Sequence, residues 1–347
     1  MNIRTKILTV AALLAVWSCA EKEITPVAPE AGKPIEFGSI DTRALVDGID
    51  DVNEFSVSCA ISNLDNSDYG SIMDNVKVER SDKSTTGWDY NPKRYWLEDS
   101  YFYFVASYPY VQNGGFQKSE GDMEGVNRIG YSLEIDTMNQ QTDILTASKC
   151  VHTSDSWERD VVKFQLAHLL TNINIRITKD ASDSENNYYI KSISLYGIFT
   201  QGTYGLLPDG NKITSYWTLE GANDEDNAIV KNLDPDTPLS STAISVWGTD
   251  GLLVLPQTIN NRSAHIKIIY DYELKQDEEN QPKAEGEGKS VRREKTIIID
   301  IPGTNDWMSG NKITYNLSFA NPNKIIFRNV SVKPWGDAQS GGTIIID

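Results

Sequence analysis

The sequence predicts an all-β protein built from antiparallel β-sandwiches. From Ile35 onward, short β-rich segments follow one another, and each is closed by Gly, Asn, Asp or Pro. No segment repeats apolar residues at helical spacing over three turns, so we expect few helices. With 347 residues, 39% of them apolar and 10% aromatic, the chain is long enough for two domains that each bury a core.

The expected strands alternate apolar and polar residues or are rich in β-branched and aromatic residues. In the first half they lie at 35–40, 55–61, 76–79, 101–108, 131–135, 144–149 and 161–177. In the second half they lie at 190–199, 252–256, 265–274, 295–301, 312–319 and 324–332. The polar run between 265–274 and 295–301 predicts a long hairpin loop at the surface.

A polar stretch without periodicity, 178–188, separates two strand-rich halves. It predicts an N-terminal domain at 35–180 and a C-terminal domain at 181–347. A division near 151–158 fits nearly as well.

The N-terminus has the pattern of a secretory signal over residues 1–18. Arg4 and Lys6 form a basic start, and the apolar run that follows is about ten residues, half of what a membrane-spanning helix needs. The small Ser18 precedes Cys19, which predicts a lipoprotein whose mature chain begins at an acylated Cys19. An ordinary signal peptide cleaved near a cysteine is the alternative.

Residues 19–34 are rich in Pro, Ala and charges, as expected of a flexible linker between a lipid anchor and a folded domain. The lipid would hold the protein at the outer membrane. The acidic start of this linker favours display on the cell surface.

Charge excludes one class of partner. The formal net charge is −17, and removal of residues 1–18 makes it more negative still. Such a surface repels phosphate groups, so we expect no nucleic-acid partner and no contact with anionic membrane surfaces.

The chain shows no catalytic or metal-binding motif. Its three histidines lie in separate segments without HExxH spacing, and GxSxG is absent. We expect no metal, no cofactor and no enzymatic activity, with a glycosidase as a remote alternative because the fold sets the spacing of carboxylates. His168 is expected to be buried and bonded to the backbone. Cys59 and Cys150 are either two buried thiols or a disulfide.

Aromatic residues are concentrated between Trp88 and Tyr110. Alternation within 101–108 favours a core role for them. A glycan-binding platform is the alternative, and it would show as an exposed patch that includes Trp88, Trp96 and Trp217.

Three stretches carry a family pattern. The first is NPKRYWLEDSYFYFVASYP (91–109), an aromatic strand that ends in A-x-Y-P. The second joins TDILTA (142–147) to VVKFQLAHLLTNINIRI (161–177), and the third joins NDWMSGNKITYNLSF (305–319) to NVSVKPW (329–335). Together they resemble the fimbrillin family, the pilus and pilus-like surface lipoproteins of type V fimbriae.

The resemblance implies two tandem transthyretin-like antiparallel β-sandwich domains and no enzymatic activity. It implies a structural or adhesive subunit of a cell-surface pilus, which binds other pilin subunits by strand exchange. A monomeric surface lipoprotein that binds glycan or a host protein receptor is the alternative.

The same resemblance implies proteolytic processing between Arg43 and Ala44 by a trypsin-like protease. Cleavage there would displace the first strand, whose apolar residues are Ile35, Phe37 and Ile40, with Ile40 out of strict phase. The alternative is that Arg43 is an ordinary loop arginine.

The C-terminus offers a candidate donor strand. A Gly-Gly hinge precedes four residues, Thr343, Ile344, Ile345 and Ile346, three of which are β-branched isoleucines. Such a strand could fill the groove of a neighbouring subunit by β-augmentation. A final strand docked on its own domain is the equal alternative.

Overall fold

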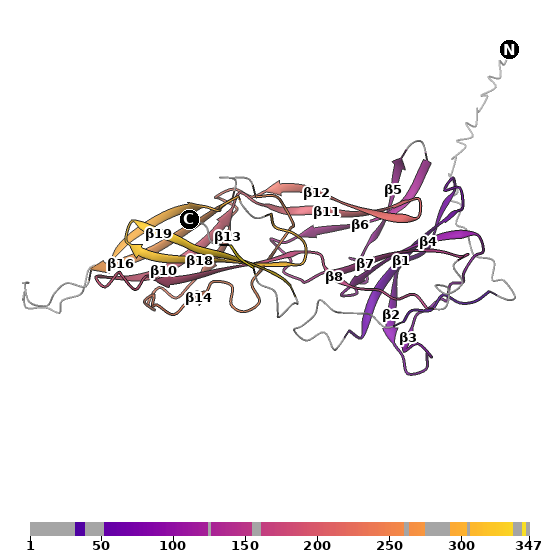
Figure 1. Cartoon of the computed structure of the whole chain (residues 1–347), viewed down its shortest axis with the longest axis horizontal. Coiled ribbons are helices and arrows are strands. Elements are labelled where there is room, and N and C mark those ends of the chain that lie inside the picture. Colours follow the sequence, from indigo (N-terminus) through magenta and orange to yellow (C-terminus); the bar gives the residue numbers. More distant parts are fainter. Residues whose placement is uncertain are drawn as a thin grey trace, which may run out of the picture.

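The computed structural model describes residues 32–38, 52–123, 126–154, 161–259, 264–274, 292–303, 306–335 and 342–344. Every regular element in these ranges is a β-strand, and nearly all strand pairs are antiparallel, so the all-β prediction is confirmed. Figure 1 shows an elongated molecule, with β1 to β4 at one end and β10, β16, β18 and β19 at the other. We refer to these ends as the N-terminal and C-terminal lobes.

The N-terminal lobe is centred on a six-stranded sheet. Both faces of this sheet are buried, because alternation along β4 sends Phe102 and Phe104 into one apolar cluster and Tyr103 and Val105 into another. The core role expected for these aromatics is therefore confirmed. The strands, in sheet order, are β3 (Trp88–Asp89), β2 (Tyr69–Arg80), β1 (Glu54–Asn63), β4 (Ser100–Tyr108), β7 (Leu145–His152) and β8 (Ala167–His168).

A four-stranded sheet covers the face that carries Tyr103. Leu133 and Leu206 from this second sheet pack against Tyr103 and Val105. Its strands, in sheet order, are β12 (Lys212–Ala222), β11 (Phe199–Asp209), β6 (Val126–Asp136) and β5 (Gln117–Met123). The β11–β12 hairpin thus returns from the second half of the chain to pair with β6.

The opposite face of the central sheet is covered by extended segments rather than by a regular sheet. Residues 32–38, 90–97 and 161–166 supply this layer, and their apolar side chains join the cluster around Phe104. The described part of the expected strand 35–40 does not form a regular ladder. Phe37 forms an isolated bridge with Val162, and Pro34, just before the expected strand, forms one with Tyr95.

The C-terminal lobe is a sandwich of two sheets around an Ile-rich core that includes Ile173, Ile193 and Ile266. One sheet contains, in order, β14 (Ile244–Ser245), β9 (Thr171–Lys179), β18 (Asn311–Asn321), β19 (Lys324–Pro334) and β20 (Gly342–Ile344), with β15 (Leu252–Val254) beside β9. The other contains β13 (Ile229–Asn232), β10 (Asn186–Tyr196), β16 (His265–Leu274) and β17 (Arg293–Asp300). β9 and β18 are parallel, unlike the antiparallel pairing that we expected.

The expected division into 35–180 and 181–347 does not follow the sheets. β9 precedes that division and pairs with β18, whereas β11 and β12 follow it and join β6. The polar stretch 178–188 runs from the end of β9 through a turn at Asp180–Asp183 into β10, within one lobe. The stretch therefore connects β9 and β10, whose sheets face each other in the C-terminal lobe.

Cys59 and Cys150 are not joined by a disulfide. Cys59 on β1 lies opposite Phe104, and Cys150 on β7 lies opposite Tyr103. Since Phe104 and Tyr103 point to opposite faces of the central sheet, the two thiols are separated by the sheet itself.

None of the residues described above forms a helix of the length and apolar character that a bilayer crossing requires.

Candidate functional site

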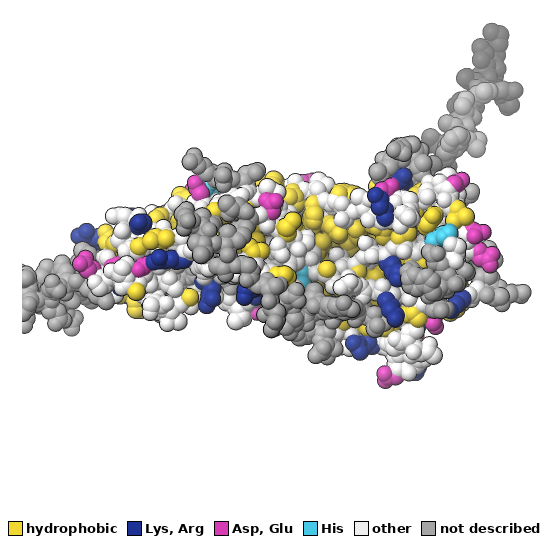
Figure 2. Space-filling view, viewed as in Figure 1, with side chains coloured by type: hydrophobic (Ala, Val, Ile, Leu, Met, Phe, Trp, Pro, Cys, Tyr) yellow, Lys and Arg dark blue, Asp and Glu magenta, His cyan; other side chains and the backbone are white. Residues whose placement is uncertain are grey.

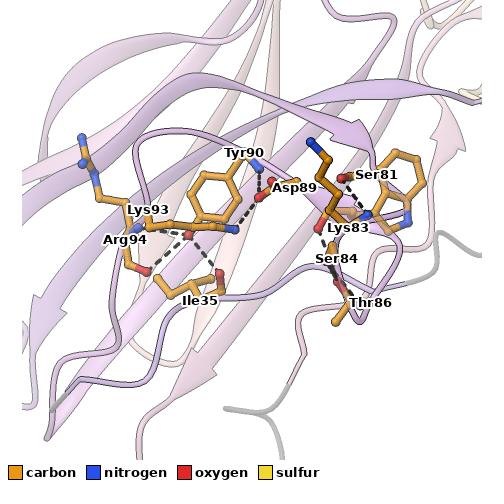
Figure 3. A network of polar contacts seen from close by, with 10 residues as sticks. Ile35, Ser81, Lys83, Ser84, Thr86, Asp89, Tyr90, Lys93 and Arg94 are labelled. Carbon is orange, nitrogen blue, oxygen red and sulfur yellow. Dashed lines mark hydrogen bonds and ion pairs between the residues drawn. The ribbon is translucent and has the colours of Figure 1, made fainter.

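The described N-terminal segment, residues 32–38, is the candidate functional site, and we call it the cover segment. On one side it runs antiparallel to residues 94–96. The Ile35 N–H donates to the Arg94 carbonyl at 2.8 Å, and the Trp96 N–H donates to the Lys33 carbonyl at 3.1 Å. Figure 3 shows the Tyr90 hydroxyl between Ile35 and Arg94, where it donates to the Ile35 carbonyl at 2.9 Å. Burial raises the pKa of Tyr90 to about 12.

On its other side the cover segment pairs in parallel with Val162. The Val162 N–H donates to the Glu36 carbonyl at 2.7 Å, and the Gly38 N–H donates to the Val162 carbonyl at 2.9 Å. The segment therefore occupies a central position in its layer, between two stretches that are far apart in the sequence. Its removal would leave unpaired backbone groups on both neighbours.

The side chains of the cover segment alternate. Ile35 and Phe37 have exposed fractions of 0% and 1%, whereas Glu36 between them is partly exposed. The Phe37 ring is surrounded by four other rings, with centroid distances of 6.2 Å to Phe55, 5.3 Å to Tyr90, 6.2 Å to Phe104 and 6.0 Å to Phe164. The segment is thus part of the core of the N-terminal lobe.

Burial and hydrogen bonding both hold the cover segment in place. Two fully buried large apolar side chains contribute about 3–6 kcal/mol together. Each backbone hydrogen bond adds a net of about 0.5–1.5 kcal/mol.

Several residues expected at the site lie outside the described ranges: Cys19, Ile40, Arg43, Ala44, Ile345 and Ile346. Of the candidate donor strand, Thr343 and Ile344 belong to β20, which pairs with β19 on the edge of a sheet of the same chain. Thr343 lies opposite Ser331, and Ile344 lies opposite Val330. In this structure residues 342–344 are therefore docked on their own lobe, and among the described residues β20 pairs with β19 alone.

His168 and Trp335, from two of the recognised motifs, meet in the structure. Their rings stack with centroids 4.0 Å apart and an angle of 3° between the planes. His168 is buried, as expected, and its Nδ1 lies 2.9 Å from the Asp143 carboxylate. The stack joins the end of β19 to β8 and so ties the two lobes together. Both residues belong to sequence motifs recognised above, but no pattern near either residue predicted that they contact each other.

The tryptophans that would mark a binding platform do not form an exposed patch. Trp88 and Trp96 are each 7% exposed within the core of the N-terminal lobe, and Trp217 is half-buried against the other apolar cluster. Figure 2 shows apolar side chains gathered over β11 and β12, where Phe199 and Tyr216 are exposed. These findings count against a platform built on the three tryptophans.

A surface depression of about 520 Å³ lies on the solvent face of β6 and β11. Its polar lining consists of Glu134, Asp136, Gln140, Gln201, Thr203 and Glu220, without a histidine or cysteine. Across the described ranges, no group of three or more His, Cys, Asp or Glu side chains is placed to hold a metal ion.

The fold and the sequence together define the class of protein. The fimbrillin-like family model matches residues 42–335, so the chain belongs to the fimbrillin-like family, as its motifs predicted. No curated protein matches the chain.

The solved structures that match this chain include three proteins from Bacteroides. A fimbrial protein from Bacteroides vulgatus ATCC 8482 is 17% identical, with a TM-score of 0.54, over 87% of this chain and 99% of that chain. A candidate cell adhesion protein from Bacteroides uniformis ATCC 8492 is 16% identical, with a TM-score of 0.42, over 88% and 99% of the two chains. Another from Bacteroides ovatus ATCC 8483 is 17% identical, with a TM-score of 0.40, over 88% and 98%. The similarity to the Bacteroides vulgatus protein shows that the two chains share a fold.

Proposed function

We propose that this chain is a structural or adhesive subunit of a cell-surface pilus, assembled by protease-triggered strand exchange. Its membership of the fimbrillin-like family and the shared fold with a fimbrial protein support a pilus subunit without enzymatic activity. In the proposed cycle the chain is exported, acylated at Cys19 and held at the outer membrane by its lipid. A trypsin-like protease then cleaves after Arg43, and another pilin subunit fills the vacated groove.

The position of the cover segment carries this proposal. Its centre is buried between residues 94–96 and Val162. Cleavage after Arg43 would cut its only covalent link to residues 44–347. From then on it would be held only by the contacts described above.

The magnitudes allow exchange after cleavage. Burial of Ile35 and Phe37 contributes about 3–6 kcal/mol, and the backbone bonds add a few more. Association of a separate strand costs about 4–15 kcal/mol in lost freedom, which is of the same order. A cut segment is therefore held weakly enough for a competing strand to replace it.

A donor strand can restore what the cover segment provides. The Arg94 carbonyl and the Trp96 N–H would be open on one side of the groove, and both backbone groups of Val162 on the other. A strand that enters by β-augmentation pairs with these groups and fills the apolar pockets. The chain's own residues 343–346 could serve another subunit in this way, because β20 is an edge strand of its sheet among the described residues.

Mass spectrometry of protein extracted from the cell surface tests the processing step. The proposal expects an N-terminus at Ala44. An exclusively acylated, full-length species would exclude polymerisation through this groove and leave a monomeric or anchoring role, such as glycan or host-protein binding.

Electron microscopy of cells tests assembly. Arg43→Ala should abolish both the Ala44 terminus and the filaments that contain this subunit. Arg293→Ala, which removes an exposed arginine elsewhere, is the matched control and should leave both unchanged. Normal incorporation of the Arg43→Ala protein into filaments would contradict the proposal.

A further inference from the structure

The pockets beneath the cover segment define which strands can replace it. We propose that the groove accepts a donor strand with the pattern apolar, any residue, aromatic, glycine, supplied by a different protein and not by the C-terminal strand of a second copy of this chain. This inference rests on the proposed function above.

The pocket of Phe37 is shaped for a flat ring. Phe55 and Phe104 meet the Phe37 ring edge to face, at angles of 82° and 89°, while Phe164 stacks on it at 25°. Tyr90 closes the remaining side at 60°. Aromatic pairs in such geometries contribute attraction beyond the area that they bury. An aliphatic side chain fills less of the pocket and forms none of these pairs.

The next position is crowded by side chains of the neighbouring stretch. A Cβ atom at Gly38 would lie 2.5 Å from Val161 Cγ1 and 3.2 Å from Lys163 Cγ. The Gly38 N–H is bonded to the Val162 carbonyl, so the backbone cannot move away without losing that bond. A donor strand with any larger residue here must displace the Val161 side chain.

The two preceding positions are less selective. The pocket of Ile35 is fully buried and takes an aliphatic residue, whereas Glu36 faces partly outward and sets no requirement. The residue pattern that the groove accepts is therefore the pattern of residues 35–38 themselves.

The C-terminal strand of this chain does not match that pattern in any alignment. With Ile344 in the pocket of Ile35, Ile346 takes the ring pocket and Asp347 takes the place of Gly38. With Ile344 in the ring pocket, Ile345 takes the place of Gly38 instead.

The out-of-phase alignments fail for similar reasons. With Thr343 at the Ile35 position, Ile346 takes the place of Gly38, and with Ile345 there, the carboxylate of Asp347 enters the ring pocket. Burial of an unpaired carboxylate is strongly unfavourable. The subunit is therefore expected to have unlike neighbours, one that fills its groove and one that receives its C-terminal strand.

Peptide exchange on the nicked chain tests this inference. The mature full-length chain is cleaved after Arg43 and incubated with an excess of synthetic peptide, and native mass spectrometry measures how much of the cut N-terminal fragment each peptide replaces. The peptides correspond to residues 33–40, to the same segment with Phe37→Ile, Gly38→Val or Glu36→Ala, and to residues 341–347.

The 33–40 peptide and its Glu36→Ala form should replace the fragment equally well. The Phe37→Ile and Gly38→Val forms should bind at least about tenfold more weakly, and the 341–347 peptide more weakly still. Binding of the 341–347 peptide within about threefold of the 33–40 peptide would overturn the inference while the proposed function stands. If no peptide, including 33–40, binds a nicked chain that keeps its β-sheet circular dichroism, the proposed function fails and the inference fails with it.

Discussion

Replacement of Phe37 by alanine is expected to destabilise the N-terminal lobe by about 3–5 kcal/mol, the usual cost of a buried Phe→Ala change. The ring is 1% exposed and contacts four other rings, so its removal leaves a cavity that those rigid rings cannot easily fill. Urea unfolding of the mature chain, followed by tryptophan fluorescence, measures the change. With slopes of about 2–3 kcal/mol per molar urea, the midpoint should fall by about 1–2.5 M.

Phe199→Ala is the matched control, because Phe199 is 36% exposed on β11. It should change the free energy of unfolding by less than about 1 kcal/mol. Equal effects of the two substitutions, or a Phe37→Ala effect below about 1 kcal/mol, would refute the reasoning that the cover segment belongs to the core.

Three further predictions follow from buried groups. Tyr90→Phe removes the hydroxyl bonded to the Ile35 carbonyl and should cost about 1–3 kcal/mol at pH 8. Burial raises the pKa of Tyr90 from 10.0 to about 12. The contribution of its protonated hydroxyl to the free energy of unfolding is therefore complete below pH 10 and is lost as the pH rises through 12. Tyr90→Phe should reduce the loss of stability that is measured across this pH range. Burial also raises the pKa of the Cys59 thiol. Iodoacetamide at pH 8 should therefore modify Cys59 only after denaturant is added, which peptide mapping measures. Modification of Cys59 in the folded chain would contradict its burial. Trp335→Ala removes the ring that stacks on His168 and should lower the free energy of unfolding by about 2 kcal/mol. Proteolysis near the end of β19 should also become faster. An unchanged proteolysis rate would argue that this stack does not join the lobes.

Local patterns predicted much of the fold. Alternation in 101–108 assigned Phe102 and Tyr103 to opposite faces of a buried strand, and both side chains are buried. The absence of helical periodicity predicted an all-β chain, and the motif order predicted the family. These features depend on short-range regularities, which the sequence displays directly.

Long-range pairing could not be predicted in the same way. Nothing within 199–222 indicates that this hairpin joins β6 and not its neighbours in sequence, and nothing within 171–179 indicates a parallel partner in β18. The polar stretch 178–188 suggested a boundary because an exposed connection and an interdomain linker have the same composition.

The candidate site was predictable in part. Alternation placed Ile35 and Phe37 on one face, and both are buried. The segment lacks a regular ladder because its two neighbours, 94–96 and Val162, each contribute only a short stretch of backbone. The ring pocket of Phe37 is assembled from residues up to 127 positions further along the chain, at Phe164, and no local pattern could reveal it.

Hydrogen exchange at two backbone amides tests the central claim most directly. The Trp96 and Val162 N–H groups are bonded to carbonyls of the cover segment, at Lys33 and Glu36. The account predicts that both amides are protected in the uncut chain, exchange rapidly once the fragment is cut and stripped away, and regain protection in assembled filaments. Protection that survives removal of the fragment, or that does not return on assembly, would contradict the claim that a neighbour's strand takes the place of the cover segment.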